Sequence, residues 1–221
     1  MKRLSLTSLA IAALTAVVLA QDPVKVDPAH YKVILDNASV RVLNVTYPVG
    51  GKSVMHSHPE GIAIALTPSS VRFGLPDGKS QDSEMANESA MYMPAGTHNP
   101  TNIAKTANHV IVVEFKAAKP GTATLPNART GMGMKPLAEG ARGIAYRATA
   151  APDFAEPAGS KHDFDQVVIA LGPTQMSLAI DGKPAKTTWA RGDVQFIGRG
   201  VPHESKNTSG KPVDMIIVAI K

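Results

Sequence analysis

An internal repeat constrains the fold of this 221-residue chain more than any other feature of its sequence. Four segments recur in the same order, and the members of each pair lie 104 or 105 residues apart. The pairs are residues 64–68 and 169–173, 77–79 and 181–183, 96–102 and 200–207, and 110–116 and 215–221. Four matches at one spacing indicate that a single folding unit has been duplicated.

The duplication predicts two domains and a connecting segment. The first domain is expected to span residues 21–116, and the second residues 144–221. Between them, residues 117–143 are rich in Gly, Pro, Ala and Thr and show no apolar periodicity. This composition is typical of a linker or long loop.

Apolar and polar residues alternate in several short segments of each copy. Residues 40–46 alternate, and residues 71–75 do the same before Asp77 and Gly78. Alternation on both sides of an Asp-Gly pair is typical of antiparallel strands joined by a hairpin turn. Short strands separated by turn residues, with 17 Pro and 18 Gly in the chain, predict an all-β fold in which each copy closes into a small barrel.

The first twenty residues have the features of a secretory signal peptide. Lys2 and Arg3 precede an apolar stretch over residues 6–19, and Ala20 is a suitable residue before a cleavage site. Residues 1–20 are therefore expected to be removed on export, which leaves a periplasmic or secreted protein with no membrane segment. The alternative is an uncleaved membrane anchor, for which the apolar stretch is short.

The chain contains no cysteine, which excludes disulfides, thiolate metal ligands and a lipid-modified N-terminus. The formal charge is +5, and it falls to +3 without Lys2 and Arg3. Because the basic residues are spread out, the sequence does not favour a nucleic-acid partner.

Three histidines of the first copy predict a metal site. His56 and His58 are separated by one residue, so in a strand their side chains share a face. His98 follows a Pro-x-Gly turn 40 residues after His58. Three imidazoles are a common ligand set for one divalent transition metal, which could be Fe, Mn, Ni, Cu or Zn. The alternative is a group of histidines that only form hydrogen bonds.

These histidines lie in two motifs that resemble those of the cupin superfamily. The first cupin motif runs Gly, five residues, His-x-His, three or four residues, Glu, and the second contains Pro-x-Gly, His and Asn. The matching residues are Gly50, His56, His58, Pro94, Gly96, His98 and Asn102. The resemblance covers nearly the whole chain after residue 20, once per copy. It implies two tandem jelly-roll barrels, a bicupin. The sequence particularly resembles small cupins with a His-x-His-Pro-Asp/Glu sequence, many of which have no assigned function.

The first motif lacks its usual glutamate. The family pattern places this residue near position 62 or 63, where the chain has Ile62 and Ala63. Glu60 is the nearest carboxylate, and strict strand alternation would place it on the face of His56 and His58. Either the metal has three protein ligands, or Glu60 serves as a fourth ligand or as a catalytic base.

The second copy keeps the second motif but only part of the first. His203 and Asn207 match His98 and Asn102, whereas the segment before them offers only His162. His162, Gln166 and His203 are a candidate for a weaker neutral site. The alternative is a barrel kept only for packing.

Three interpretations of function follow. The first is an exported, metal-dependent oxidoreductase that acts on a small molecule, because the three-histidine set resembles the iron site of thiol dioxygenases within the cupin superfamily. The second is a non-catalytic protein that holds a small ligand. The third is a structural bicupin in which neither site works. The resemblance also makes a homodimer a candidate assembly.

Overall fold

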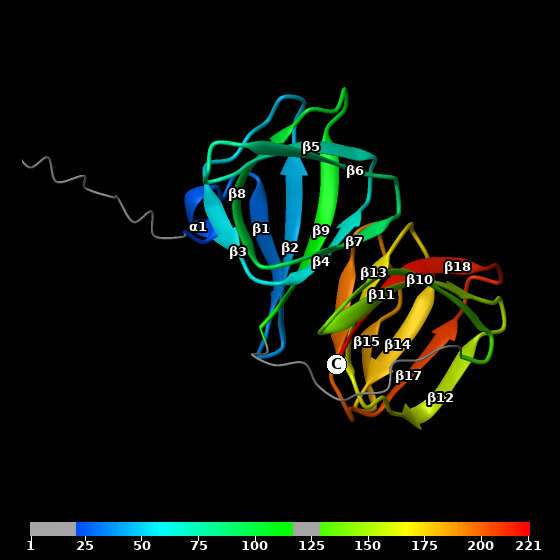
Figure 1. The fold of residues 1–221 in the computed structure, drawn as a ribbon. Coiled ribbons are helices and arrows are strands. Elements are labelled where there is room, and N and C mark those ends of the chain that lie inside the picture. Colours follow the sequence, from blue (N-terminus) through cyan, green and yellow to red (C-terminus); the bar gives the residue numbers. More distant parts are fainter. Residues whose placement is uncertain (1–20, 117–128) are drawn as a thin grey trace, which may run out of the picture.

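The structure, a computed structural model, describes residues 21–116 and 129–221, and these fold into two β-barrels (Figure 1). One short helix, α1 (Pro23–Val26), precedes the first barrel. The strands of the first barrel are β1 (Tyr31–Asp36), β2 (Val40–Tyr47), β3 (His56–His58), β4 (Gly61–Ala65), β5 (Ser69–Gly74), β6 (Ser80–Met85), β7 (Ala90–Met93), β8 (Gly96–Asn102) and β9 (Asn108–Phe115). Those of the second are β10 (Met132–Gly140), β11 (Gly143–Ala150), β12 (Ala155–Ser160), β13 (Asp165–Ala170), β14 (Met176–Ile180), β15 (Lys183–Lys186), β16 (Val194–Ile197), β17 (His203–Asn207) and β18 (Val213–Ile220).

The two barrels have the same antiparallel strand order, which confirms the duplication. Each contains a five-stranded sheet, ordered β1-β2-β9-β4-β7 in the first barrel and β10-β11-β18-β13-β16 in the second. Each also contains a four-stranded sheet, ordered β3-β8-β5-β6 or β12-β17-β14-β15. The prediction of an all-β, two-barrel fold is therefore confirmed.

The expected hairpin turns form in both copies. β5 pairs with β6 across the turn that contains Asp77 and Gly78, and β14 pairs with β15 across Asp181 and Gly182. In the second turn both central residues have positive φ, 51° for Asp181 and 71° for Gly182. This conformation matches the twist of the flanking strands and favours Asp-Gly.

The two five-stranded sheets share one apolar layer that joins the barrels. Val42, Ile64 and Val113 of the first barrel belong to the same buried cluster as Ile169 and Ile216 of the second, and all five are fully buried. Each such side chain contributes about 1.5–3 kcal/mol when it leaves water. Barrel strands such as β4 and β9 are consequently apolar on both faces, one toward the barrel interior and one toward the partner barrel (Figure 1).

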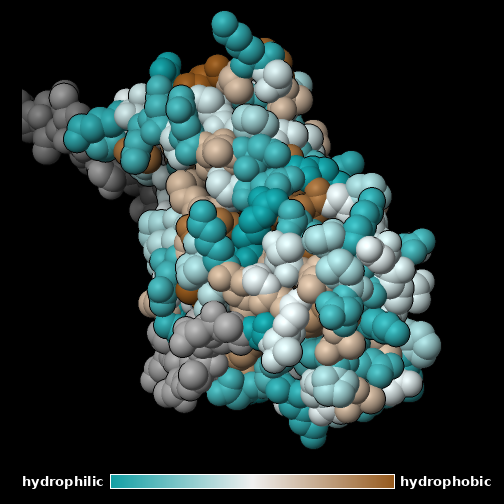
Figure 2. Space-filling view, turned by 90° about the vertical axis from the view of Figure 1, so that its right-hand side faces the viewer, coloured by the Kyte–Doolittle hydropathy of each residue, from teal (hydrophilic) through white to brown (hydrophobic). Residues whose placement is uncertain are grey.

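Ion pairs between charged side chains also connect the two barrels. Arg191 donates to Glu88 at 2.8 Å, and Arg147 donates to the other oxygen of Glu88 at 2.9 Å. Both contacts run from the second barrel to the first. The remaining surface is mostly hydrophilic on the face shown in Figure 2, where hydrophobic patches are small and separate.

The asparagine of the second motif has the same structural role in both barrels. The Asn102 amide donates to the carbonyls of Tyr47, Pro48 and Thr106 at 3.0–3.2 Å. The Asn207 amide donates to the carbonyls of Ala151 and Lys211 at 2.8 and 2.7 Å. Both side chains are buried, so these asparagines fix the loops at the same end of each barrel.

The predicted linker is too long. Strand β10 lies inside it and pairs with β11 over its whole length, with a bulge between Pro136 and Ala138. Gly133, Pro136 and this bulge remove the alternation that would have marked a strand. Residues 117–128 of the linker and the predicted signal peptide lie outside the described residues. Within the described part of the chain, no helix is long and apolar enough to cross a membrane.

Candidate metal centre

The structure brings the rings of the three first-barrel histidines together. His56 and His58 lie on β3, and His98 lies on the neighbouring β8, directly opposite His56. The His98 ring centroid lies 5.2 Å from that of His56 and 4.8 Å from that of His58. All three rings line a cavity inside the first barrel.

Both ring nitrogens of His56 already have hydrogen-bond partners. Nδ1 lies 2.8 Å from the Val54 carbonyl, which can only accept, so Nδ1 carries the proton. Nε2 then accepts from the Tyr31 hydroxyl at 3.1 Å, and this hydroxyl accepts from Tyr47 at 2.8 Å. His56 could bind a metal through Nε2 only if Tyr31 gave up its hydrogen bond.

Burial keeps the imidazoles of His56 and His98 neutral. The pKa of His98 is lowered to about 3, mainly by burial and in addition by the neighbouring rings of His58 and His56. Burial likewise lowers the pKa of His56. A neutral imidazole is the form that binds metals, so the protonation state suits the predicted site although the hydrogen bonds of His56 do not.

Glu60 does not join the three histidines. Its carboxylate pairs with Arg142 of the second barrel at 3.0 Å, and Glu60 is absent from the described residues that line the first cavity. β3 ends at His58 and β4 begins at Gly61, so the strand alternation behind the predicted role does not continue to position 60. The ion pair between Glu60 and Arg142 therefore links the two barrels. This position of Glu60 does not support its predicted role as a fourth ligand or base.

A different carboxylate, that of Glu114 on β9, faces the first cavity. It is 1% exposed, and its Oε2 accepts from Arg41 Nε at 2.5 Å. The sequence interpretation missed this residue. The sequence did contain a sign of it, because Glu114 is an acidic residue inside the apolar run 110–115. If both faces of that strand are buried, the Glu114 side chain must be buried too.

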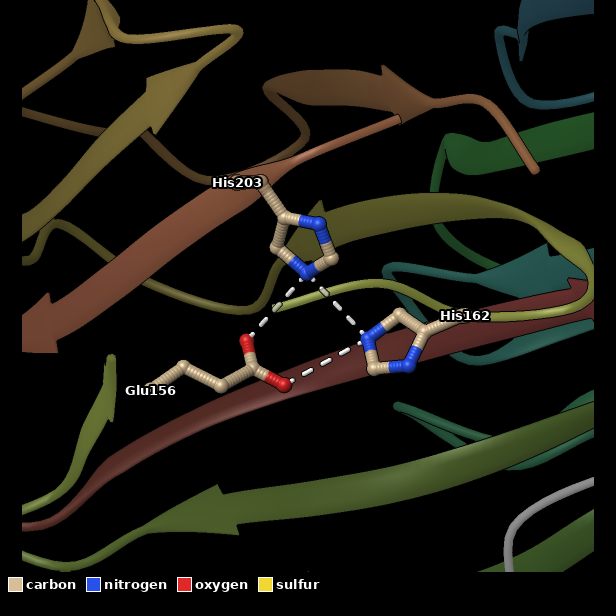
Figure 3. Close-up of side chains that lie close together, drawn as sticks. All are labelled: Glu156, His162 and His203. Atoms are coloured by element: carbon tan, nitrogen blue, oxygen red, sulfur yellow. Dashed lines mark hydrogen bonds and ion pairs between the residues drawn. The ribbon is translucent and has the colours of Figure 1, made fainter. Parts of the chain in front are cut away.

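In the second barrel, two histidines and a glutamate converge closely (Figure 3). His203 Nε2 lies 3.2 Å from His162 Nε2 and 3.5 Å from Glu156 Oε2. His162 Nε2 lies 3.3 Å from Glu156 Oε1. Among the described residues, this is the only group of three or more potential metal ligands whose ligand atoms all lie within 4.8 Å of one another.

Strand register explains how these residues meet. Ser160 lies opposite His203, as His56 lies opposite His98 in the first barrel. Glu156 lies further along β12, opposite Ser205, and a bulge separates it from Ser160. The sequence interpretation missed Glu156 because Pro157 and Gly159 break the alternation of β12, and no motif position corresponds to it.

Gln166, the third member of the predicted second site, is set apart from the two histidines by an arginine. Arg129 donates to Gln166 Oε1 at 3.1 Å, and its other terminal nitrogen lies 3.5 Å from Glu156 Oε1. The structure thus brings together His162 and His203 of the predicted set, whereas Glu156 takes the place expected for Gln166.

The basic residues around Glu156 favour its ionised form, and Glu156 in turn favours the protonated form of His203. Burial by itself would raise the pKa of Glu156, but hydrogen bonds from His162 and His203 and the nearby charge of Arg129 outweigh it, so the pKa lies well below its usual range. The hydrogen bond to Glu156 raises the pKa of His203. The carboxylate is therefore ionised and poised to bind a cation.

The donor set and its spacing fit a transition-metal ion. Two imidazole nitrogens and a carboxylate bind such ions at about 2.0–2.2 Å, so ligands of one ion lie about 3.0–3.5 Å apart. The separations of 3.2, 3.3 and 3.5 Å fall in this range. His203 Nδ1 lies 3.1 Å from the Val201 carbonyl, which directs Nε2 toward the cluster.

Of the three cluster residues, Glu156 lines a cavity inside the second barrel, whose volume is about 540 Å³ including its opening to solvent, whereas His162 and His203 are absent from the described residues that line it. Glu156, Arg129 and Gln166 form part of its polar lining, and most of the rest is apolar. The apolar residues include Met132, Met176, Leu178, Trp189 and Ile197. An apolar cavity with a few converging polar groups is the usual form of a small-molecule site.

Comparisons with known proteins identify the fold. No protein-family model and no curated protein match this sequence. AerE from Microcystis aeruginosa is 13% identical over 91% of this chain and 97% of its own, with a TM-score of 0.68. A cupin 2 conserved barrel domain protein from Leptotrichia buccalis is 11% identical over 86% of this chain and 88% of its own, with a TM-score of 0.56. A salicylate 1,2-dioxygenase from Pseudaminobacter salicylatoxidans is 8% identical over 82% of this chain and 71% of its own, with a TM-score of 0.59.

These similarities, at low sequence identity, concern the fold. Together with the repeated strand order they confirm the resemblance drawn from the motifs, and the chain has the two-barrel cupin fold.

Proposed function

We propose that this protein is a metal-binding bicupin whose metal is held in the second barrel by Glu156, His162 and His203. The observation that carries the proposal is the convergence of their ligand atoms within 4.8 Å. A divalent transition metal fits two imidazole nitrogen donors and one carboxylate, and Fe, Mn, Ni, Cu and Zn are the candidates.

The donor set favours an oxidoreductase that acts on a small molecule. Two histidines and one carboxylate leave several positions of an octahedral metal open, and this set is typical of non-haem iron oxygenases. A bound iron would supply the redox chemistry needed to activate dioxygen. That a dioxygenase shares this fold supports a dioxygenase-like activity for the chain.

The residues around the cluster would hold the ligands and exclude water. Ser205 donates to Glu156 Oε2 at 2.9 Å, and Arg129 approaches Oε1, so the carboxylate is oriented from both sides. The His162 ring stacks on Phe164, with centroids 5.0 Å apart and planes at 10°. Trp189 closes the apolar part of the cavity, and its indole donates to the Met176 carbonyl at 2.9 Å. A substrate in this cavity would contact mostly apolar side chains beside Glu156.

The first barrel provides a second candidate metal site at His56, His58 and His98. The closeness of the three rings and the lowered pKa values of His56 and His98 favour it. Metal binding there would require His56 to lose its hydrogen bond from Tyr31. A non-catalytic ligand-binding protein and a structural bicupin are the alternatives to an enzyme. We also propose export to the periplasm or exterior, on the basis of the basic and apolar residues at the N-terminus.

Metal analysis and oxygen consumption together test this function. The mature chain, purified without chelators, should contain about one metal equivalent, and Glu156→Gln should lose most of it. Glu88→Gln is a matched control, because Glu88 is likewise a largely buried, ion-paired carboxylate but is absent from the described residues that line the two barrel cavities. Oxygen uptake with a panel of diols, diketones and thiols separates an oxygenase from a binding protein. Absence of metal from the wild type after reconstitution would refute the metal site and leave a structural or metal-free binding bicupin.

A further inference from the structure

The cavity of the first barrel contains a buried carboxylate oxygen without a hydrogen-bond partner. Glu114 is 1% exposed, and one of its oxygens accepts from Arg41. The other, Oε1, has no partner in the structure. Nearly all buried polar atoms in proteins are paired, and Glu114 is one of the residues that line the cavity, so a ligand bound there could supply the missing donor once the carboxylate turns toward it.

The surroundings of Glu114 are apolar and large enough for a small organic molecule. The cavity measures about 730 Å³ including its opening to solvent. Its apolar wall includes Val71, Phe73, Met85, Met91, Met93 and Val110. Flexible methionine side chains adapt readily to the shape of a bound apolar group.

The local charge favours a cation over an anion. Arg41 pairs with both Glu114 and Asp22, so one positive charge is shared between two carboxylates. The three histidines aside, Glu114 is the only charged side chain among the described residues that line the cavity. Tyr31 and Tyr47 are neutral, because burial raises the pKa of both phenols.

The second barrel lacks this feature. β9 pairs Glu114 with Gly61, whereas β18 pairs Ala219 with Gln166 at the corresponding place. The acidic group is therefore specific to the first copy, and the barrel scaffold alone does not require it. It is also independent of the second-barrel cluster.

We propose that the first barrel binds a small, mostly apolar amine, whose ammonium group donates to Glu114 Oε1 and whose apolar body packs against the methionines. The chemistry that recognises the ligand is a single buried carboxylate at the end of an apolar cavity. The site thus gives the protein a ligand-binding function separate from the metal cluster of the second barrel.

Calorimetric titration of the metal-free mature chain with three probes of one size tests the proposal. The probes are benzylamine, benzyl alcohol and benzoate, which present a cation, a neutral donor and an anion on the same ring. Benzylamine should bind tightest and benzoate too weakly to measure. Equal binding of benzylamine and benzoate, or no binding of any probe, would overturn the proposal.

Two variants locate the binding site. Glu114→Gln should weaken benzylamine binding at least about tenfold, since a hydrogen bond to a charged group is lost. Ala63→Leu adds bulk to the cavity wall, leaves the pairing of Arg41 with Glu114 in place, and should abolish binding. Glu88→Gln is the control and should bind as the wild type does. If Glu114→Gln does not fold, Ala63→Leu decides, and unchanged benzylamine affinity in either folded variant contradicts the proposal.

Discussion

The two barrels share one scaffold but use it differently. In the first, three histidine rings lie close together, but Arg41 donates to the carboxylate of Glu114 and the Tyr31 hydroxyl donates to His56. In the second, only two histidines remain, but the Glu156 carboxylate converges with them. The number of motif residues that a barrel keeps is thus a poor guide to whether its ligand atoms converge.

The difference arises from where each barrel supplies its carboxylate. Glu114 lies on β9 of the five-stranded sheet, opposite Gly61. Glu156 lies on β12 of the four-stranded sheet, on a strand that pairs directly with the strand carrying His203. A carboxylate next to the histidine strands can reach the imidazoles, and the β12 bulge helps to direct it there.

Removing a histidine from the second barrel should have the largest effect. His203→Ala should lower metal affinity at least about 100-fold, because even partners outside the ligand set typically contribute 10–100-fold. Competition with a metallochromic chelator measures this change. The matched variant His98→Ala should leave the affinity of the tightest site within about threefold of the wild type. The reverse pattern would place the tight site in the first barrel.

Removing the motif-two asparagine should affect both barrels alike. Asn102→Ala removes the donor to three carbonyls, and Asn207→Ala removes the donor to a similar set, although the Pro48 and Ala151 carbonyls each keep one backbone N–H donor. Each variant should lose about 2–3 kcal/mol of unfolding free energy, as expected for the loss of two to three hydrogen bonds of a buried amide. Urea denaturation followed by circular dichroism measures the loss.

The asparagine variants separate scaffold from site. Because neither asparagine touches the histidine clusters, folded Asn207→Ala should keep the metal content of the wild type. An Asn207→Ala protein of unchanged stability, or one that folds but loses its metal, would mean that this residue serves the site and not the loops.

Removing the hydrogen bond between Tyr31 and His56 should raise the metal affinity of the first barrel, by a smaller factor than the loss expected for His203→Ala. Tyr31→Phe removes the hydroxyl that occupies Nε2, so metal should bind the first barrel about three- to tenfold tighter, in line with about 0.5–1.5 kcal/mol for one hydrogen bond. The measurement requires a His203→Ala background, which silences the second barrel. If Tyr31→Phe leaves the affinity unchanged or weaker, Tyr31 does not compete with metal.

The sequence predicts the fold well because the fold depends on features repeated along the chain. The repeat spacing, strand alternation and Asp-Gly turns predict two β-barrels, and the strand pairing confirms them. Strand β10 was not predicted, because Gly133, Pro136 and a bulge interrupt its alternation of apolar and polar residues. A strand of this kind is stabilised by its neighbour β11 and not by its own pattern.

The sites were harder to predict because they depend on side chains brought together across strands. His162 and His203 could be found by comparison with the first copy, but Glu156 matches no motif position, and only the register of β12 with β17 brings it to them. The role predicted for Glu60 depended on alternation across a break between β3 and β4. Whether Nε2 of His56 is free to bind a metal depends on Tyr31, 25 residues away in sequence.

The most direct test of this comparison is to locate the metal. Crystals of the mature protein, purified without chelators and measured at the absorption edge of the metal found by elemental analysis, should give an anomalous peak within about 2.0–2.3 Å of His162 Nε2, His203 Nε2 and a Glu156 oxygen. A peak found only between His56, His58 and His98, with none at Glu156, would contradict the account.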